Sequence, residues 1–146
     1  LYEQKMDSAS IIFLKNEKNE VLFERRSHSK KDAPNCWALP AGTCLENEGP
    51  EECAIREAKE ELGVGVEVQR LIKSHSYTRE SGKEISIHIF LCKIKSGEPV
   101  IKIPEETAEL KWETLDNFFR KYKDEEIGKG LQKLRTEYKN LNIDPN

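Results

Sequence analysis

The feature that most constrains this chain is a helix over residues 49–63, because both its ends and both its faces are marked in the sequence. Gly49 and Pro50 suit a helix start, two acids follow near the positive end of the dipole, and Gly63 suits the helix end. At about 100° of rotation per residue, one arc of the helix is apolar and the next is acidic. The apolar arc contains Ala54, Ile55, Ala58 and Leu62, and the acidic arc contains Glu57, Glu60 and Glu61. The pattern predicts a helix that packs on one side and gathers negative charge on the other.

The three neighbouring acids indicate a metal site. Like charges three or four positions apart destabilise a helix by a few tenths of a kcal/mol, so the arrangement gains nothing unless a cation binds. Carboxylate oxygens select Mg²⁺ or Mn²⁺, which prefer a few carboxylates together with substrate phosphate oxygens. The alternative is a solvated helix face, since 35% of the chain is charged. The fixed spacing of Gly42, Glu48, Arg56 and Gly63 around the acids favours the metal site.

Residues 42–64 resemble the Nudix box, a signature of hydrolases that cut nucleoside diphosphates linked to another moiety. Every fixed glycine, arginine and glutamate of that signature is present, and only Ala58 is small for its position. The preceding residues 37–42 also resemble the family's usual lead-in, with Ala41 where a glycine often stands. The resemblance implies an α/β fold, a three-layer α/β/α sandwich with a mixed β-sheet, formed by residues 1–146 as one domain.

The resemblance also assigns roles inside the box. It implies that catalysis depends on a bound Mg²⁺ or Mn²⁺ whose ligands are Glu57, Glu60, Glu61 and the backbone carbonyl of Gly42. Glu48 and Arg56 are expected to form a charged pair that holds the loop against the helix and orients the carboxylates. An ordinary surface salt bridge is the alternative interpretation of that pair.

A further carboxylate often completes such sites, as a metal ligand or as the base that takes a proton from the attacking water. Glu105 and Glu106, in a distant loop, are the candidates, and Glu106 is preferred. A solvated loop acid is the alternative for either residue.

Hydrophobic patterns predict strands on both sides of the acidic helix. Residues 10–14 and 21–26 indicate a hairpin, and residues 36–39 a further strand that Pro40 breaks before the loop to the helix. Two long strands follow at 66–77 and 85–95, and a short one at 110–112. A brief helix is predicted over 115–119 and a longer one over about 125–141, where apolar residues recur at helical spacing. This order of elements indicates an α/β protein.

Candidates for substrate binding lie outside the box. Arg25 and Arg26 end a strand that borders the substrate cleft in related folds, and guanidinium groups suit phosphate geometry, so both are assigned to the substrate with Arg26 first. Lys30 and Lys31 are interpreted as solvated loop residues. Phe90 is assigned as a surface for a nucleobase, although a core position is the alternative for it and for two further candidates, Tyr77 and Phe118.

Composition limits the partners. A net charge of −3 and a pI near 5.8 give no electrostatic footprint for a nucleic acid polymer. The sequence has no bilayer-spanning apolar run and no leader pattern, so we expect a cytoplasmic protein without a membrane partner, as a monomer or homodimer. The four cysteines are expected to be reduced, and their spacing is not that of a zinc motif.

The substrate is inferred from spacing downstream of the box. The positions of residues 96–99, residues 104–106 and Trp112 resemble the branch that hydrolyses nucleoside triphosphates, including oxidised ones, to a monophosphate and pyrophosphate. ADP-ribose or a dinucleoside polyphosphate is the alternative substrate. A catalytically silent Nudix-like ligand sensor is a different alternative, which the intact box disfavours. An isomerase of the same fold is disfavoured because the added cysteine and glutamate of such enzymes are not seen in the expected arrangement.

Overall fold

The computed structural model describes residues 7–143. Its elements follow in the order β1 (Asp7–Leu14), β2 (Val21–Arg26), β3 (Trp37–Ala38), β4 (Ala41–Thr43), α1 (Pro50–Leu62), β5 (Gly65–Thr78), β6 (Glu84–Ser96), β7 (Thr107–Glu113), α2 (Leu115–Lys121) and α3 (Lys129–Glu137). Two short 3₁₀ helices, Asp124–Glu126 and Tyr138–Asn140, flank α3. The two long strands, the acidic helix and the brief helix lie where the sequence predicts them.

The strands form two sheets, one with the order β4-β1-β6-β5 and the other with the order β3-β2-β7. The first is mixed, since β1 runs parallel to β6 and antiparallel to β4. The predicted hairpin of residues 10–14 and 21–26 is limited to one antiparallel bridge between Lys15 and Val21. Beyond this bridge the prediction is wrong, because β4 and β6 occupy both edges of β1 and β2 pairs with β3 and β7 instead. The segment after Pro40 is also a strand rather than the start of a loop, since residues 41–43 pair with β1 as β4.

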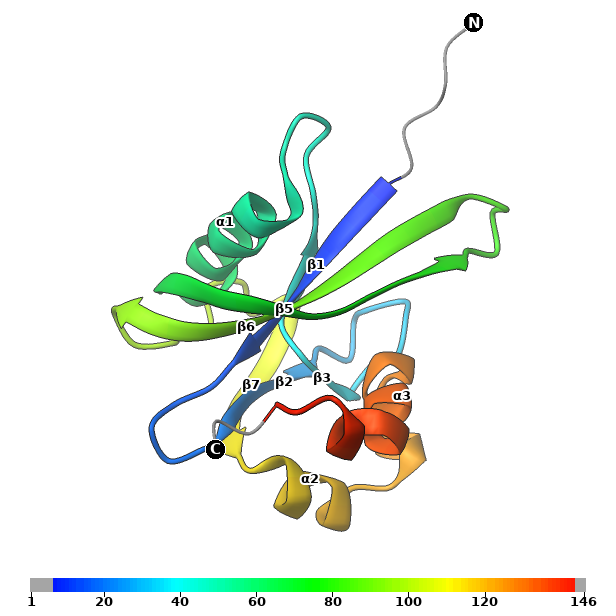
Figure 1. Cartoon of the computed structure of the whole chain (residues 1–146). Helices are drawn as coiled ribbons and strands as arrows, with labels where there is room; N and C mark the ends of the chain where they lie inside the picture. Colours follow the sequence, from blue (N-terminus) through cyan, green and yellow to red (C-terminus); the bar gives the residue numbers. More distant parts are fainter. Residues whose placement is uncertain (1–6, 144–146) are drawn as a thin grey trace, which may run out of the picture.

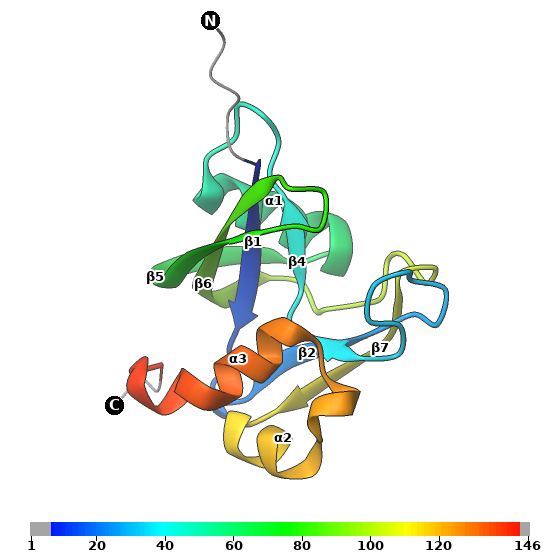
Figure 2. The ribbon, with the colours of Figure 1, turned by 90° about the vertical axis from the view of Figure 1, so that its right-hand side faces the viewer.

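The sheets lie between α1 on one side and α2 with α3 on the other (Figure 1). Figure 2 shows the same layers from the side, with α1 behind β1 and β4 and with α3 below these two strands. Two apolar clusters fill the two interfaces. The cluster under α1 includes Ile12, Leu14, Leu22, Ala54, Ala58, Leu62 and Phe90. The cluster under α2 and α3 includes Phe13, Phe23, Trp37, Phe118, Leu131 and Leu134. The expected three-layer sandwich with a mixed sheet is confirmed.

Helix α1 has the ends that its sequence predicts, and its apolar face is confirmed except at Ile55, which is 42% exposed. Gly49 precedes it in an extended conformation, and Gly63 ends it at φ +72°, a left-handed conformation that glycine adopts without a steric penalty. The Gly63 amide donates to the Lys59 carbonyl at 3.0 Å, which satisfies an otherwise open helix end. Ala58 and Leu62 are buried against the sheet. Burial of this arc fixes the rotation of the helix and therefore the direction of its glutamates.

The long helix predicted over residues 125–141 is wrong in its extent. Residues 124–126 and 138–140 are 3₁₀ turns, and the α-helix covers only Lys129–Glu137. Glycine is a poor helix former, and the Gly128 amide donates instead to the Trp37 carbonyl at 2.9 Å. Ile127 pairs with Trp37 as an isolated bridge and is buried in the core. These tertiary contacts place Ile127 outside α3, although its position fits the apolar stripe of that helix.

Candidate active site

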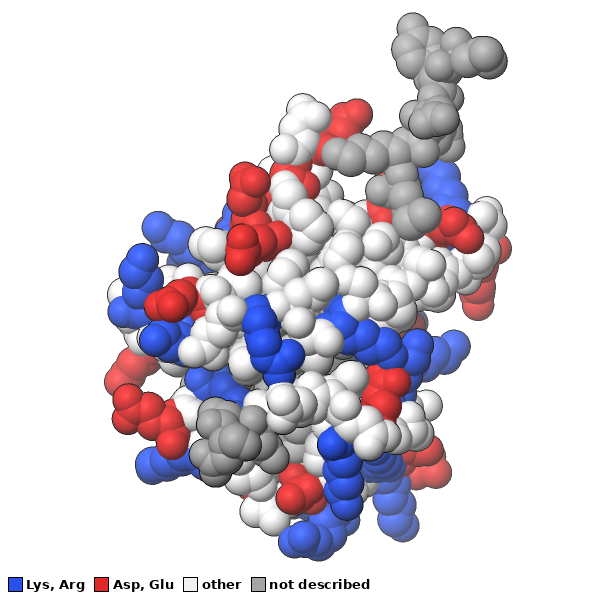
Figure 3. Space-filling view, in the orientation of Figure 1, with Lys and Arg blue, Asp and Glu red and all other residues white. Residues whose placement is uncertain are grey.

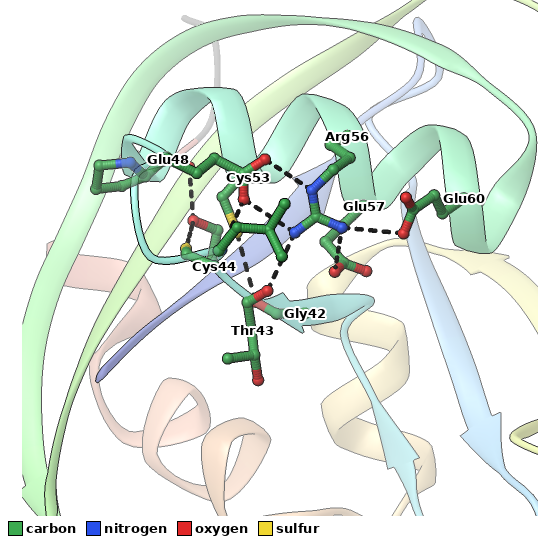
Figure 4. A network of polar contacts seen from close by, with 11 residues as sticks. Gly42, Thr43, Cys44, Glu48, Cys53, Arg56, Glu57 and Glu60 are labelled. Atoms are coloured by element: carbon green, nitrogen blue, oxygen red, sulfur yellow. Dashed lines mark hydrogen bonds and ion pairs between the residues drawn. The ribbon is translucent and has the colours of Figure 1, made fainter.

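Arg56 is the centre of a charged network that joins α1 to the loop before it (Figure 4). Its Nε and one terminal nitrogen donate to the two carboxylate oxygens of Glu48 at 2.7 and 2.9 Å, a bidentate pairing. The other terminal nitrogen donates to Glu57 and to Glu60, each at 2.9 Å. A further hydrogen bond of 3.1 Å reaches the Thr43 carbonyl, at the end of β4. One side chain therefore holds the loop, the strand end and two of the predicted ligands.

Glu48 is fixed as an anion by this network. The hydrogen bonds from Arg56 lower the pKa of Glu48 to about 2, and the Leu45 amide donates a further hydrogen bond of 3.0 Å. The same contacts raise the pKa of Arg56 above its usual range. The geometry agrees with the predicted support role of the pair and differs from a lone surface salt bridge, because the side chains are only 23% and 12% exposed.

Gly42 lies directly beneath the Glu57 carboxyl group. A Cβ atom at position 42 would lie 2.0 Å from the Glu57 carboxyl carbon, so only glycine leaves room for that side chain. Burial is the main effect on Glu57 and raises its pKa, although Arg56 opposes the shift. The Gly42 backbone and the Glu57 carboxylate, both predicted metal ligands, are therefore neighbours across the β4–α1 junction.

Glu61 is the most perturbed acid of the site. Burial raises its pKa to about 9, and three surrounding carboxylates, those of Glu24, Glu57 and Glu106, add to the shift. Its Oε2 atom is buried and has no hydrogen-bond partner among residues 7–143. An orphaned carboxylate oxygen among other acids is costly unless a cation is added. The carboxylates of Glu57 and Glu61 therefore fit a hard divalent cation, while the Gly42 carbonyl, the other predicted ligand, accepts from the Cys53 thiol at 3.7 Å.

Glu60 contributes differently from its two neighbours. Its side chain is 59% exposed and bonded to Arg56, at the rim of the network. It lies on the same helix arc as Glu57 and Glu61, one turn beyond Arg56, so it could join the cation by releasing that ion pair.

Glu106 lies beside the acidic cluster although 45 positions separate it from Glu61 in the sequence. The Ser27 amide donates to the Glu106 carbonyl at 2.9 Å, which ties the loop before β7 to the end of β2. Its carboxylate raises the pKa of both Glu61 and Glu24. Both Glu105 and Glu106 are exposed, but it is the Glu106 charge that acts on Glu61 and Glu24, and the Glu105 carbonyl accepts from the Ser29 hydroxyl at 3.0 Å. The structure thus brings Glu106, and not Glu105, to the acids of α1.

Two residues of this cluster were not assigned from the sequence. Glu24 lies on β2, only 8% exposed, with a pKa raised by burial and a hydrogen bond of 3.1 Å from Thr107. Lys30, interpreted as a solvated loop residue, lies with its Nζ atom 3.9 Å from Glu106 and electrostatically stabilises the charged form of Glu61. An acid that follows three apolar residues of a buried strand was a signal for Glu24. Nothing local marked Lys30, whose placement depends on the fold of its loop.

The predicted substrate residues divide into two groups. The Arg26 charge acts on Glu24, and its Nε atom donates to the Asp32 carbonyl at 2.9 Å, so this residue borders the cluster. Arg25 points to the opposite side of β2 and pairs with Glu109 on β7 at 3.2 Å. Its assignment to the substrate is therefore not supported by its position.

The assignment of Phe90 as a nucleobase surface is corrected by its burial. The ring is 7% exposed and belongs to the apolar cluster under α1, because residues of β6 alternate between the two faces of the sheet. Phe118 is fully buried and stacked on Phe23, with ring centroids 3.7 Å apart. Tyr77 is exposed at the far end of β5. None of the three forms a base platform beside the acids.

The remaining surface adds two limits. On the face in Figure 3, basic and acidic side chains are interspersed and form no extended patch of one sign. Among residues 7–143, every helix falls short of the length and apolar content needed to cross a bilayer.

The fold is an α/β/α sandwich with a mixed sheet, and its acidic helix lies beside a strand and a loop that contribute further acids. Comparison with known proteins identifies the family that has this arrangement. The NUDIX domain family matches residues 4–134. The chain therefore belongs to the NUDIX domain family, as the resemblance in the sequence implied.

Individual relatives differ in what they act on. A prenyl-diphosphate phosphatase of Methanosarcina mazei is 27% identical over 117 residues, which cover 80% of this chain and 69% of that protein. An isopentenyl-diphosphate Delta-isomerase of Cereibacter sphaeroides is 31% identical over 112 residues, covering 71% and 62%. The curated relatives are longer than their matched segments, which span as little as 40% of their length.

A solved structure of similar shape is the MutT protein of Methanosarcina mazei. It has a TM-score of 0.75 and 19% identity, and the match covers 99% of this chain and 100% of that one. At this identity the likeness shows the fold alone.

Proposed function

We propose that this chain is a hydrolase that breaks a pyrophosphate bond with the help of a divalent cation held by Glu57, Glu60, Glu61 and the Gly42 carbonyl. The observation that carries the proposal is the buried Glu61 Oε2, which has no partner among the described residues and lies near three further carboxylates. A core without function would not retain such an acid, because burying it uncompensated is destabilising. A cation supplies the missing partner.

The bound cation, Mg²⁺ or Mn²⁺, would neutralise charge on the phosphate oxygens and make a water molecule more acidic. The chain's own residues then divide the remaining work. Arg56 orients Glu57 while Glu48 holds Arg56 in place. Glu106 lies within the cluster on a separate loop, where it can accept the proton of the attacking water.

Two cations of the chain suit the substrate's phosphates. Lys30 lies 3.9 Å from Glu106, so a phosphate bound beside the acids would fall within reach of its ammonium group. Arg26 borders the same cluster and has its Nε atom fixed by the Asp32 carbonyl, which leaves its terminal nitrogens to serve as a fork for a phosphate. Arg26 ends β2, and Lys30 lies in the loop that follows it.

The first substrate candidate is a nucleoside triphosphate, oxidised or not, cleaved to a monophosphate and pyrophosphate. It rests on the spacing downstream of the box. A second candidate is an isoprenoid diphosphate. Two observations favour it: the relative matched over 80% of the chain is a prenyl-diphosphate phosphatase, and none of the three aromatic candidates forms a base platform beside the acids. ADP-ribose and dinucleoside polyphosphates are further arms of the same test, and a silent sensor would turn over none of them.

The experiment is a product assay with Mg²⁺ across nucleoside triphosphates, oxidised triphosphates, ADP-ribose, dinucleoside polyphosphates and short isoprenoid diphosphates. Phosphate, pyrophosphate and the organic product are each measured. We expect turnover of one class that disappears in Glu61→Gln. Metal binding without turnover of any member would refute the enzyme and favour a ligand sensor.

A further inference from the structure

A second group of side chains that could hold a metal ion shares Glu48 with the Arg56 network. The side chains of Cys44, Glu48 and Cys53 each offer a donor atom, and these atoms lie within 4.8 Å of one another. Figure 4 shows the three residues converging from the loop after β4 and from the first turns of α1. Such a set of two sulfurs and one carboxylate oxygen differs in chemistry from the all-oxygen site of the glutamates.

More oxygen atoms surround the two thiols. The Ser10 hydroxyl lies 3.5 Å from the Cys44 sulfur and donates to the Pro50 carbonyl at 2.6 Å. The Cys53 thiol contacts the Gly42 carbonyl at 3.7 Å. Cys53 is fully buried, whereas Cys44 is partly exposed and gives access from solvent. The backbone holds the group in place, since the Cys44 amide donates to the Ser8 carbonyl at 2.8 Å and the Cys53 amide to the Gly49 carbonyl at 2.9 Å.

We propose that Cys44, Cys53 and Glu48 form a second metal site that takes a thiophilic divalent cation such as Zn²⁺. Two thiolates and a carboxylate are established zinc donors, and three protein ligands leave a fourth position for water. Soft sulfur ligands select against Mg²⁺, so Zn²⁺ would bind at the thiols and Mg²⁺ at the glutamates. Binding of one Zn²⁺ would release the two thiol protons to solvent.

Occupation of this site would lower the activity of the neighbouring one. Glu48 is the residue that anchors the Arg56 guanidinium, and Arg56 in turn holds Glu57 and Glu60. A cation bound to the Glu48 carboxylate competes with Arg56 for the same oxygens. The Cys53 sulfur also lies against the Gly42 carbonyl, a predicted ligand of the other site. Zinc would thus disturb both the orientation of the carboxylates and the Gly42 backbone, an effect that depends on the proposed function.

Co²⁺ tests the site directly, because thiolate ligation gives it an intense near-ultraviolet charge-transfer absorption that oxygen ligands do not give. Reduced, metal-free protein is titrated with Co²⁺, and Zn²⁺ is then added to displace it. We expect one Co²⁺ per chain with the thiolate absorption, and loss of that absorption on adding Zn²⁺. Cys44→Ser, at a partly exposed position, should weaken binding at least about tenfold. Absence of the absorption from the wild-type protein would overturn the proposal without recourse to any variant.

Matched controls come from the other two cysteines. Cys36→Ser and Cys92→Ser should retain the absorption, since the Cys36 sulfur contacts the Glu125 carbonyl and Cys92 is buried in the sheet. Circular dichroism checks the fold of each variant, and Cys44→Ala provides a second substitution. An equal signal in the Cys44 and Cys36 variants would place the cation elsewhere and overturn the proposal.

An activity arm separates this inference from the proposed function. With Mg²⁺ in excess, buffered Zn²⁺ should inhibit the wild-type protein at concentrations that leave Cys44→Ser active. Equal inhibition of both proteins would show that zinc acts at the glutamates and would overturn the inhibitory role. If no substrate is turned over, the proposed function fails, while the Co²⁺ absorption still decides whether the thiol site exists.

Discussion

Replacement of Glu61 by Gln should remove activity and yet stabilise the metal-free protein. In the folded state burial raises the pKa of Glu61 to about 9, from an ordinary value of 4.5. Between these values the folded chain holds a proton that the unfolded chain has lost. The folded state therefore binds more protons, and the free energy of unfolding falls as the pH rises through this range. The stability that the protonated Glu61 retains is fully present below the unfolded pKa, and it is progressively lost as the pH rises from there to about 9.

The size of the effect follows from the same two values. Each pH unit above the unfolded pKa costs about 1.4 kcal/mol while the folded group stays protonated, so Glu61 destabilises the metal-free protein by about 3 kcal/mol at neutral pH. Domains are stable by only about 5–15 kcal/mol, which makes this a large share. Glutamine has nearly the same shape and no charge, so it removes the dependence on pH.

The assay is urea unfolding of both proteins in a chelator, at about pH 5 and about pH 7.5. We expect the free energy of unfolding of Glu61→Gln, relative to that of the wild type, to be about 3 kcal/mol higher at the upper pH than at the lower one. Added Mg²⁺ should stabilise the wild type more than the variant. Glu60→Gln is the matched control, because its 59% exposed side chain lies on the same helix, and its stability should follow the wild type more closely. A difference between Glu61→Gln and wild type that does not change with pH would refute the reasoning.

Three further predictions concern the same site. Gly42→Ala should lower turnover by about 100-fold, because its Cβ atom would lie 2.0 Å from the Glu57 carboxyl carbon and displace that side chain. Steady-state kinetics and a Mg²⁺ titration measure this effect, and normal kinetics would contradict the assigned contact. Glu106→Gln should lower kcat by about 10²-fold or more through loss of a base or ligand. The control variant Glu105→Gln should change kcat by less than about twofold. Equal effects of the two substitutions on kcat would remove Glu106 from the site. Arg26→Ala should raise KM more than it lowers kcat if it binds phosphate equally in the ground and transition states, and an unchanged KM would remove it from the substrate contacts.

Much of the chain's local structure is determined by the sequence alone. The ends of α1 follow from Gly49, Pro50 and Gly63, and its two faces follow from a period that is fixed by helix geometry. The long strands at 65–78 and 84–96 follow from alternation and from the turn between them. These signals succeed because neighbouring residues carry all the information that caps, turns and periodicity need.

Pairing of strands could not be derived in this way. The first two strands looked like a hairpin, and only the competition of β4 and β6 for the edges of β1 sends β2 to a different sheet. The C-terminal stripe of apolar residues likewise suggested one helix, whereas the contact of Gly128 with the Trp37 carbonyl begins the helix after Ile127. In both cases a partner distant in sequence outweighs the local pattern.

The site divides along the same line. The sequence determined the acids of α1 and their support by Glu48 and Arg56, because fixed spacing on one helix and its preceding loop sets their relative positions. Only the tertiary structure brought Glu24 and Lys30 to those acids and placed Phe90 in the core. The physical reason is that a helix carries its own geometry, whereas contacts between a strand, a loop and a helix exist only once the layers have packed.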